Sequence, residues 1–398
     1  MAKPKIRFKG FTDDWEQRKF SELYAKSSEK NDGSIGMDRN ITVATMQFKE
    51  DVKVSTAEYL KTYYTFNFGD IAFEGHQSKE FRYGRFVEND IGNGIVSHIF
   101  AVFRPIKEFD LQFWKYAINN EMLMQRILSR STKASTMMHD LVTEDFLNET
   151  FLVPSLDEQK KIGAYLKNLD HLITLHQRKC EETKKLKKYM LQKMFPQNGQ
   201  KVPEIRFSGF TDDWEQRKLE DYIVEYHEVT TESNQYPALT SSRKGIFLQT
   251  EYFAGNQIAS EDNTGYNVVP YGYFTYRHMS DDEIFHFNIN DIVENGIVST
   301  LYPVFTTTEE LDSRYLQYQL NHGHEFARFA VLQKQGGSRT YMYLSKLKQL
   351  SLTMPKTVDE QKQISVFFME LDHLITLHQH KCEQLQSMKK FMLQNMFV

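Results

Sequence analysis

The 398-residue sequence contains only two cysteines, Cys180 and Cys382, and nine prolines, none of which follow one another. Two cysteines are too few for the disulfide framework of a small secreted protein. No run of 18 apolar residues occurs, so we expect no membrane-spanning helix. The first thirty residues lack the apolar stretch of a signal peptide. The sequence therefore predicts a cytoplasmic protein.

Several motifs that carry catalysis are also missing. Without a Pro-Pro pair, the chain has no Asn/Asp-Pro-Pro-Tyr-type motif, with which amino-group methyltransferases hold a flipped base. It also lacks the Gly-x-x-x-x-Gly-Lys-Ser/Thr phosphate loop, the Gly-x-Ser-x-Gly nucleophile turn and the His-Glu-x-x-His zinc motif. We therefore predict that the chain is not an enzyme and that it holds no cofactor and no metal.

The charge is close to balanced, with 49 Lys and Arg against 53 Asp and Glu. This balance excludes a uniformly basic nucleic-acid binder but allows a local basic patch. Residues 201–355 carry only 13 basic against 21 acidic side chains. Any DNA contact in that region must therefore come from a restricted surface. Hydrophobic residues make up 40% of the chain, which suffices for folded cores.

The main signal is an internal repeat of about 200 residues. The segment IRFKGFTDDWEQRKF, which starts at Ile6, returns from Ile205 with 13 of 15 positions identical. The segment LDHLITLHQRKC, which starts at Leu169, returns from Leu371 with 11 of 12 identical. The roughly 130 residues between these segments differ between the copies. The pattern therefore predicts that the two copies of the repeated ends perform the same role, and that the two middles perform different roles.

Each repeat ends in a long pattern with alternating spacings of four and three, which predicts a helix with a heptad-type seam. A helix from Leu156 to Phe195 would be about 60 Å long. Such a helix must bury its apolar face, and the other long helix of the chain is the partner at hand. A pseudo-two-fold axis would make the two helices antiparallel. The predicted seam consists of Ile162, Leu166, Leu169, Ile173, His176, Cys180, Ile364, Phe368, Leu371, Ile375, His378 and Cys382.

Within that seam, a His-x-x-x-Cys pair occurs once in each helix. Two His and two Cys side chains suit tetrahedral zinc, if an antiparallel pairing brings them together. The other interpretation is that these semi-polar residues fix the register of the helices. We predict no metal, and the zinc alternative stays open.

The middles have a mixed α/β pattern. Segments rich in β-branched and aromatic residues, such as 41–47 and 94–105, predict strands. Residues 110–128 and 313–333 each predict one helix at a corresponding place in the two copies. The fold class is therefore α+β, with two tandem mixed domains that are each followed by a long helix.

This plan resembles the specificity (S) subunit of Type I restriction–modification systems. The resemblance covers the whole chain and rests on VPSLDEQKKIGAYLKNLDHLI, from Val153, and MPKTVDEQKQISVFFMELDHLI, from Met354. Both are similar to the Pro-x-x-x-Glu-Gln-x-x-Ile start of that family's long helices. The phrase GFTDDWEQRK is similar to openings in the same family.

The resemblance implies that each middle is a target recognition domain for one half of a gapped double-stranded DNA site. It implies an antiparallel coiled coil as spacer, two docked adenine methyltransferase (M) subunits, and restriction/translocase (R) subunits that supply the motor and nuclease. The predicted parts are recognition domain 1 (1–155), the first spacer helix (156–196), a linker (197–204), recognition domain 2 (205–355) and the second spacer helix (356–398).

DNA contacts are expected from basic, amide and hydroxyl side chains in loops of the two middles, because these groups bind base edges and phosphates. The loops before the final strand of each middle, with Lys133 and Arg339, are the favoured positions. The candidates are His76, Gln77, Lys79, Arg82, Arg85, Arg130, Thr132, Lys133, Arg243, Lys244, Arg277, His278, Ser338 and Arg339.

Other repeated residues allow two interpretations. The aromatics around Trp15 and Trp214 fit core packing, or docking of a partner. The lysines at 184, 185, 187 and 188 fit contact with a partner or DNA, or a solvated helix face. The second helix has Gln384, Gln386 and Ser387 in that region, which argues against a role common to both helices. A different class of function also remains, namely a duplicated coiled-coil scaffold whose middles bind proteins or small ligands.

Overall fold

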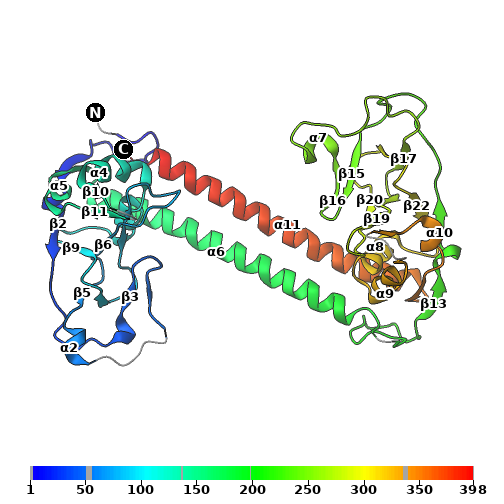
Figure 1. Cartoon of the computed structure of the whole chain (residues 1–398), viewed down its shortest axis with the longest axis horizontal. Helices are drawn as coiled ribbons and strands as arrows, with labels where there is room; N and C mark the ends of the chain where they lie inside the picture. Colours follow the sequence, from blue (N-terminus) through cyan, green and yellow to red (C-terminus); the bar gives the residue numbers. More distant parts are fainter. Residues whose placement is uncertain (1–2, 51–55, 136–137, 198, 335–338, 398) are drawn as a thin grey trace. The chain divides into compact units, whose positions relative to one another are not determined.

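The computed structural model describes residues 3–50, 56–135, 138–197, 199–334 and 339–397. These residues form two compact units (Figure 1). Unit 1 comprises the described parts of 1–178 and 378–398, and unit 2 those of 179–377. The division passes through both long helices, so each unit contains the first part of one long helix and the last part of the other.

Unit 1 is built on a four-stranded antiparallel sheet in the order β2-β9-β6-β7. Its inward side chains are mainly aromatic: Phe86 and Phe103 pack on Phe146 of α5, and Phe73 packs on Phe86. The strands are β1 (Glu16–Lys19), β2 (Tyr24–Ser27), β3 (Ile41–Thr42), β4 (Gln47–Phe48), β5 (Tyr64–Phe66), β6 (Ile71–Glu74), β7 (Arg85–Glu88), β8 (Gly94–Val96), β9 (Ala101–Pro105), β10 (Thr132–Ala134), β11 (His139–Leu141) and β12 (Thr150–Val153). The helices are α1 (Phe20–Leu23), η1 (Met37–Arg39), α2 (Ala57–Leu60), α3 (Leu111–Ile118), α4 (Glu121–Ser131), α5 (Thr143–Asn148) and α6 (Leu156–Lys193).

Unit 2 repeats the same sheet order with β14-β22-β18-β20. Its strands are β13 (Glu215–Lys218), β14 (Ile223–Glu225), β15 (Leu239–Ser242), β16 (Gly245–Leu248), β17 (Asn267–Pro270), β18 (Phe274–Thr275), β19 (Met279–Ser280), β20 (Asn288–Ile289), β21 (Asn295–Val298), β22 (Val304–Thr307), β23 (Thr340–Tyr341) and β24 (Ser351–Met354). Its helices are η2 (Leu219–Asp221), α7 (Gln249–Tyr252), α8 (Ser313–His322), α9 (His324–Leu332), α10 (Leu344–Leu347) and α11 (Val358–Asn395). The predicted α+β class is confirmed.

The helices expected over 110–128 and 313–333 are each broken in two, and the single-helix prediction was wrong. In unit 1, α3 ends at Asn119 and the side chain of Asn120 caps α4 by accepting from the Met122 amide. In unit 2, Gly323 separates α8 from α9. The strand expected over 41–47 is also a hairpin, β3–β4, whose turn contains Met46 with a φ of 48°.

The two long helices pair antiparallel, as predicted. In unit 1, Asp170 of α6 pairs with Lys389 of α11, and His176 lies beside His378 further along. In unit 2, Lys187 of α6 pairs with Asp372 of α11. Within each unit, higher residue numbers on one helix therefore meet lower numbers on the other, and Figure 1 shows α6 and α11 side by side.

The predicted seam residues lie at these packed faces. Ile162, Leu166, Leu169, Ile173 and Cys382 belong to the core of unit 1. In unit 2, Ile364, Phe368 and Leu371 belong to its core, and Cys180 is buried. Ile375, His176 and His378 are half-buried. Both cysteines are free thiols.

Each core is closed by the end of the long helix that belongs to the other repeat. Phe397, just beyond α11, stacks on Phe113 of unit 1 with ring centroids 5.5 Å apart. Phe195, just beyond α6, stacks on Phe368 of unit 2 at 6.0 Å. Trp15 and Trp214 are buried in these same cores, which favours the core-packing interpretation of the repeated aromatics.

The repeated Glu-Gln at the start of each long helix is used inside the fold. Glu158 is buried and accepts two hydrogen bonds from Arg7, at 2.6 and 2.7 Å. Glu360 accepts the same pair from Arg206, at 2.6 and 2.8 Å. The repeated opening segment is thereby tied to the repeated helix start in both units.

Candidate nucleic-acid interface

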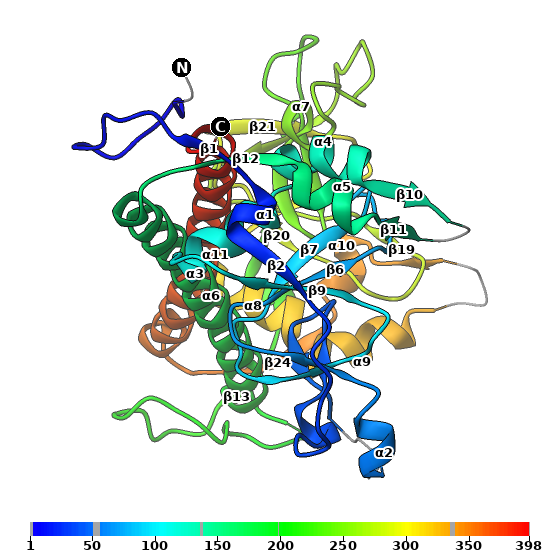
Figure 2. The same ribbon diagram turned by 90° about the vertical axis from the view of Figure 1, so that its left-hand side faces the viewer.

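The unit 1 candidates gather where the β6–β7 loop meets the β10–β11 hairpin. The amide of His139 donates to the carbonyl oxygen of Gly75 at 2.8 Å, which ties the hairpin to the end of β6. The approach is so close that a Cβ at Gly75 would lie 2.1 Å from the His139 carbonyl oxygen. Figure 2 shows unit 1 with the hairpin beside α4 and α5. We call this combined region the loop–hairpin surface.

Amide, hydroxyl and imidazole groups meet on the loop–hairpin surface. The Gln77 amide nitrogen contacts Nε2 of His139, and Oγ1 of Thr132 lies 3.4 Å from Nδ1 of the same ring. The Tyr83 ring packs edge-on against His139, with centroids 5.3 Å apart. His76 is exposed beside this cluster. The sequence analysis missed His139, because only the strand pairing brings it to the candidate loop, and it missed Tyr83, which lies within that loop.

The basic candidates of unit 1 fall into two groups. Arg85 is bound to Glu74 and to the Ala44 carbonyl oxygen, both at 2.8 Å, and Arg130 forms a bidentate pair with Glu149. Lys79, Arg82 and Lys133 are instead exposed, and no ion pair of theirs occurs within the described part of the chain. The second group can neutralise a phosphate without giving up an internal partner.

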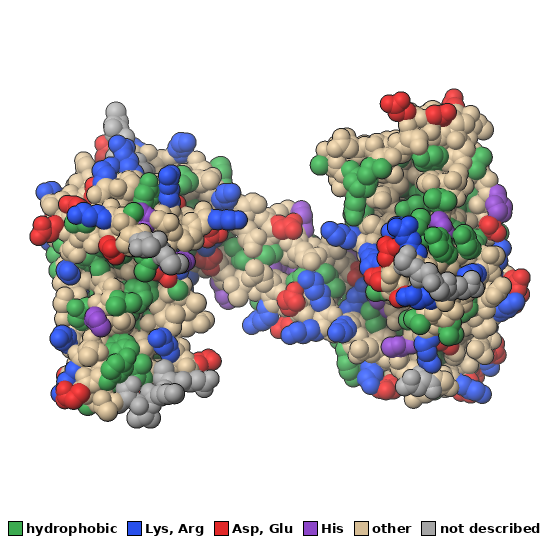
Figure 3. Space-filling model, viewed as in Figure 1, with side chains coloured by type: hydrophobic (Ala, Val, Ile, Leu, Met, Phe, Trp, Pro, Cys, Tyr) green, Lys and Arg blue, Asp and Glu red, His purple; other side chains and the backbone are tan. Residues whose placement is uncertain are grey.

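Unit 2 has the equivalent surface where β19 meets β23, and we call it the β19–β23 surface. The Met342 amide donates to the His278 carbonyl oxygen at 2.7 Å, in the place of the bond between His139 and Gly75. Two ion pairs tie neighbouring segments together here: Arg243 binds Asp282, and Arg339 binds Asp281 at 2.9 Å. Figure 3 shows basic and acidic side chains interspersed on the visible face of this unit.

The charges on this surface are mutually compensated. Hydrogen bonds from Arg243 and then Ser280 lower the pKa of Asp282, so this carboxylate stays ionised. Lys244 and Arg277 are exposed, and Ser338 lies outside the described residues. An approaching phosphate would therefore compete with carboxylates for Arg243 and Arg339, whereas Lys244 and Arg277 remain available.

Three aromatic rings pack together on the β19–β23 surface. The rings of Tyr341 and Tyr343 lie 6.0 Å apart and within 11° of parallel, and the His278 ring stacks on Tyr343 at 5.4 Å. His278 itself is buried, and burial lowers its pKa, so the ring is neutral at pH 7. Both tyrosines are exposed, at 37% and 50%. Exposed aromatic rings of this kind stack on bases, and the sequence analysis missed both.

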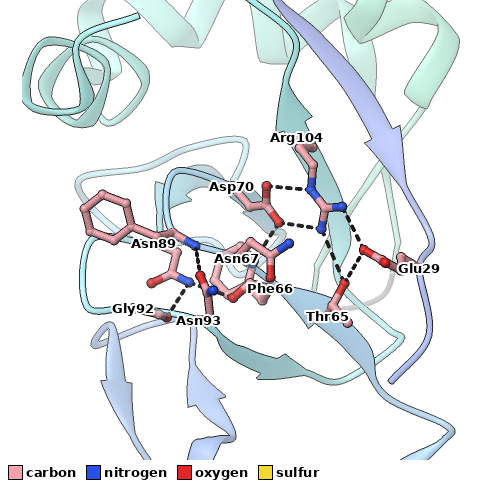
Figure 4. Close-up of polar contacts among 10 residues, drawn as sticks. Glu29, Thr65, Phe66, Asn67, Asp70, Asn89, Gly92, Asn93 and Arg104 are labelled. Atoms are coloured by element: carbon pink, nitrogen blue, oxygen red, sulfur yellow. Dashed lines mark hydrogen bonds and ion pairs between the residues drawn. The ribbon is translucent and has the colours of Figure 1, made fainter. Parts of the chain in front are cut away.

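A polar network around buried Asp70 holds the start of β6, whose other end leads into the loop–hairpin surface (Figure 4). Arg104 of β9 donates to both carboxylate oxygens of Asp70, at 3.1 and 3.2 Å, and to Glu29 at 2.7 Å. Burial raises the pKa of Asp70, and the Arg104 hydrogen bonds oppose that shift. Asn89 closes the neighbouring turn by donating to the carbonyl oxygens of Phe66 and Gly92.

A second buried carboxyl group, that of Glu88, accepts no hydrogen bond comparable to those that Arg104 donates to Asp70. Both oxygens of Glu88, at the end of β7, are buried without a hydrogen-bond partner in the described structure, as is the phenol oxygen of Tyr24. Burial, followed by repulsion from Asp90, raises the pKa of Glu88 well above its ordinary value, while Lys115 opposes the shift. The equivalent position in unit 2 holds the apolar side chain of Ile289.

Among the described residues, no group of three or more His, Cys, Asp or Glu is placed to hold a metal ion. His176 and His378 face each other with Nδ1 atoms 3.0 Å apart. Over the same residues, no helix combines the length and apolarity that a membrane crossing needs.

Comparison with known proteins shows a similarity to one family. Residues 12–185 match the family model of the Type I restriction modification DNA specificity domain. The specificity subunit of the Type I restriction enzyme MjaVIII from Methanocaldococcus jannaschii is 23% identical over 308 residues, covering 69% of this chain and 67% of that protein.

One solved structure supports the fold, and a second is reported beside it. The crystal structure of a Type I restriction–modification S subunit from M. genitalium aligns over 100% of this chain and 99% of its own, with a TM-score of 0.57 and 12% identity. The HsdS subunit from Thermoanaerobacter tengcongensis aligns over 96% of each chain with a TM-score of 0.48 and 14% identity. The chain therefore carries a match to the Type I restriction modification DNA specificity domain over residues 12–185 and is similar to a curated Type I specificity subunit.

Proposed function

We propose that this chain recognises a gapped, two-part DNA sequence for a Type I restriction–modification complex. Unit 1 would read one half-site through the loop–hairpin surface, and unit 2 the other through the β19–β23 surface. The observation that carries this proposal is that two units with the same sheet order present different side chains at equivalent places. Duplicated scaffolds with different reading surfaces suit an asymmetric site with two halves.

The chemistry at each surface supports base reading. Gln77 offers the paired donor and acceptor that suit adenine, and exposed Arg82 and Arg277 offer the fork that suits guanine. Lys79, Lys133 and Lys244 would contact phosphates and set the salt dependence. The paired rings of Tyr341 and Tyr343 give unit 2 a stacking surface that unit 1 lacks at the matching strand.

The partners in this proposal are two adenine methyltransferase subunits and the restriction/translocase subunits. Burial of Trp15 and Trp214 explains only part of the identity between the repeated openings. The exposed Thr-Asp-Asp and Glu-Gln-x-Lys residues around each tryptophan are identical as well. Two identical exposed faces suit two copies of one partner. Catalysis would reside in these partners, since the catalytic motifs are missing from this sequence.

The experiment is a map of methylated adenines across the genome of a host that expresses the methyltransferase subunit, with and without this chain. We expect one gapped motif to depend on the chain. A chimera that replaces residues 1–155 with those of another specificity subunit should change one half of the motif and keep the other. An unchanged map, with the methyltransferase active on its own control substrate, would contradict the proposal.

The scaffold alternative draws on the acidic character of residues 201–355. A salt titration of binding to duplex DNA separates the two functions. Recognition through phosphates makes the logarithm of the affinity fall linearly with the logarithm of the salt concentration. A flat or absent response would favour the scaffold.

A further inference from the structure

Three side chains form a cluster that ties the unit 1 recognition domain to both long helices. The Tyr116 hydroxyl of α3 donates to Asp170 of α6 at 2.6 Å, and Nζ of Lys389 of α11 donates to the other oxygen of Asp170 at 2.6 Å. The lysine also lies 5.2 Å from the centre of the Tyr116 ring. A carboxylate is therefore shared by a phenol from the domain and an ammonium from the opposite helix.

Unit 2 contains the same cluster at residues that are each shifted by 202 positions. Tyr318 of α8 donates to Asp372 of α11 at 2.7 Å, and Lys187 of α6 binds the same carboxylate at 2.6 and 2.7 Å. Lys187 lies 5.3 Å from the centre of the Tyr318 ring. We call these two groups the Tyr-Asp-Lys clusters. The sequence analysis missed them because it compared Lys187 and its neighbouring lysines with Gln384, Gln386 and Ser387, and not with Lys389.

The clusters differ from the charges around them. Lys187 and Lys389 keep only 17% and 25% of their side-chain surface exposed, and each reaches across to the opposite helix. Lys184, one turn away, pairs with Glu181 of its own helix and is 42% exposed. Its counterpart in the second repeat is Gln386. The two repeats therefore share the lysine that pairs with the opposite helix, Lys187 or Lys389. They do not share Lys184, which pairs within its own helix.

An apolar heptad seam by itself fixes the register of two helices weakly, because a shift along the axis exchanges one aliphatic contact for another. A polar group at one position specifies the register, because a slipped pairing leaves it unpaired. Burial, together with the hydrogen bond to Asp170, raises the pKa of Tyr116 and keeps its phenol protonated as a donor. The same causes act on Tyr318. The ion pairs of both clusters form in the same antiparallel register of α6 against α11.

We propose that the Tyr-Asp-Lys clusters are positioning elements that fix the register of α6 against α11, and so set which separation of the two half-sites the complex accepts. This inference rests on the proposed function. The carboxylate would transmit the position of the opposite helix to the recognition domain through the tyrosine. Loss of the lysines should leave base reading intact and broaden the accepted spacing.

The test uses the complete complex with its methyltransferase subunits, in cells that carry plasmids with both half-sites separated by the native spacing or by one or two base pairs more or fewer. Adenine methylation on each plasmid is the readout. For the Lys187→Met, Lys389→Met double variant, we expect methylation at the shifted spacings, relative to the native one, to rise on the order of five-fold. Lys187→Arg, Lys389→Arg should restore the native preference.

The matched control is Lys184→Met, which removes a lysine of the same helix and should keep the wild-type spacing preference. If the methionine variant fails to fold, Tyr116→Phe with Tyr318→Phe removes only the two hydroxyl groups and should broaden the spacing in the same direction. An unchanged preference in a folded variant would overturn the inference. Failure of the wild-type complex to methylate any spacing would instead overturn the proposed function, so the two failures are distinct.

Discussion

The buried carboxyl group of Glu88 makes the stability of unit 1 depend on pH in a direction opposite to that of most paired carboxylates. The folded state holds the proton of Glu88 because the group is buried and its oxygens have no partner. The unfolded chain releases that proton above about pH 4.5. The pH-dependent part of the cost of burying Glu88 is therefore absent at low pH and appears as the pH rises.

The magnitude follows from the one proton that the folded state retains. The free energy of unfolding should fall by about 1.4 kcal/mol for each pH unit, from the unfolded pKa up to the folded pKa, and stay constant above it. Glu88→Gln removes the ionisation and keeps the shape, and Glu88→Ile copies the residue at the equivalent position of unit 2. The stability of each variant relative to the wild type should be lowest near pH 4.5 and should increase progressively at higher pH.

The assay is urea unfolding of the full chain between pH 4.5 and pH 8. The Trp214→Phe background leaves Trp15 and Trp114, so that tryptophan fluorescence reports unit 1. Other ionisable groups, such as Asp70, contribute equally to both proteins and cancel in the difference. Parallel pH profiles for the wild type and Glu88→Gln would refute the reasoning, because they would mean that Glu88 ionises equally in both states.

Three further outcomes are expected. Arg7→Ala should lower the free energy of unfolding of unit 1 by about 3–5 kcal/mol, because it leaves buried Glu158 unpaired, and an apolar replacement of both residues should recover most of that loss in the same urea assay. Lys133→Ala should reduce the slope of log affinity against log salt by about 0.9 if it contacts one phosphate, whereas Arg130→Ala should leave the slope unchanged, because Arg130 is already paired inside the fold. Gly75→Ala should displace the β10–β11 hairpin, because its Cβ would lie 2.1 Å from a carbonyl oxygen of β11; recognition of one half-site should be lost and that of the other kept, as read from the methylation map.

The repeat and the heptad spacing predicted the two tandem domains and the antiparallel long helices, because both signals can be read directly from the sequence. Periodicity shows that a face is buried but not which residues cover it. For that reason, the exchange of helix ends between the units could not be predicted, although Phe195 and Phe397 stand at matching places.

The candidate DNA-binding residues were predicted from residue type alone. Residue type does not reveal which side chains are already paired inside the fold. An arginine in a loop has the same sequence signal whether it is exposed, as Arg82 is, or bound to a carboxylate, as Arg85 is. Only the pairing of β6 with β7 places Glu74 opposite Arg85. Likewise, His139 reaches Gln77 only through the hydrogen bond between the hairpin and β6. Such partners are set by contacts between residues far apart in the chain.

The exchange of helix ends also dictates an order of events during synthesis. The core of unit 1 contains Met396 and Phe397, so this core cannot close when its own recognition domain leaves the ribosome. At about 5–20 residues per second, translation of the roughly 200 residues in between takes on the order of 10–40 s. Throughout that interval, the aromatic side chains around Phe113 are not yet packed against Met396 and Phe397. Unit 2 receives its own closing residue, Phe195, before its domain has been translated. Unit 2 can therefore complete its core as soon as its own residues have been synthesised. Unit 1 can complete its core only after the end of α11 has been synthesised.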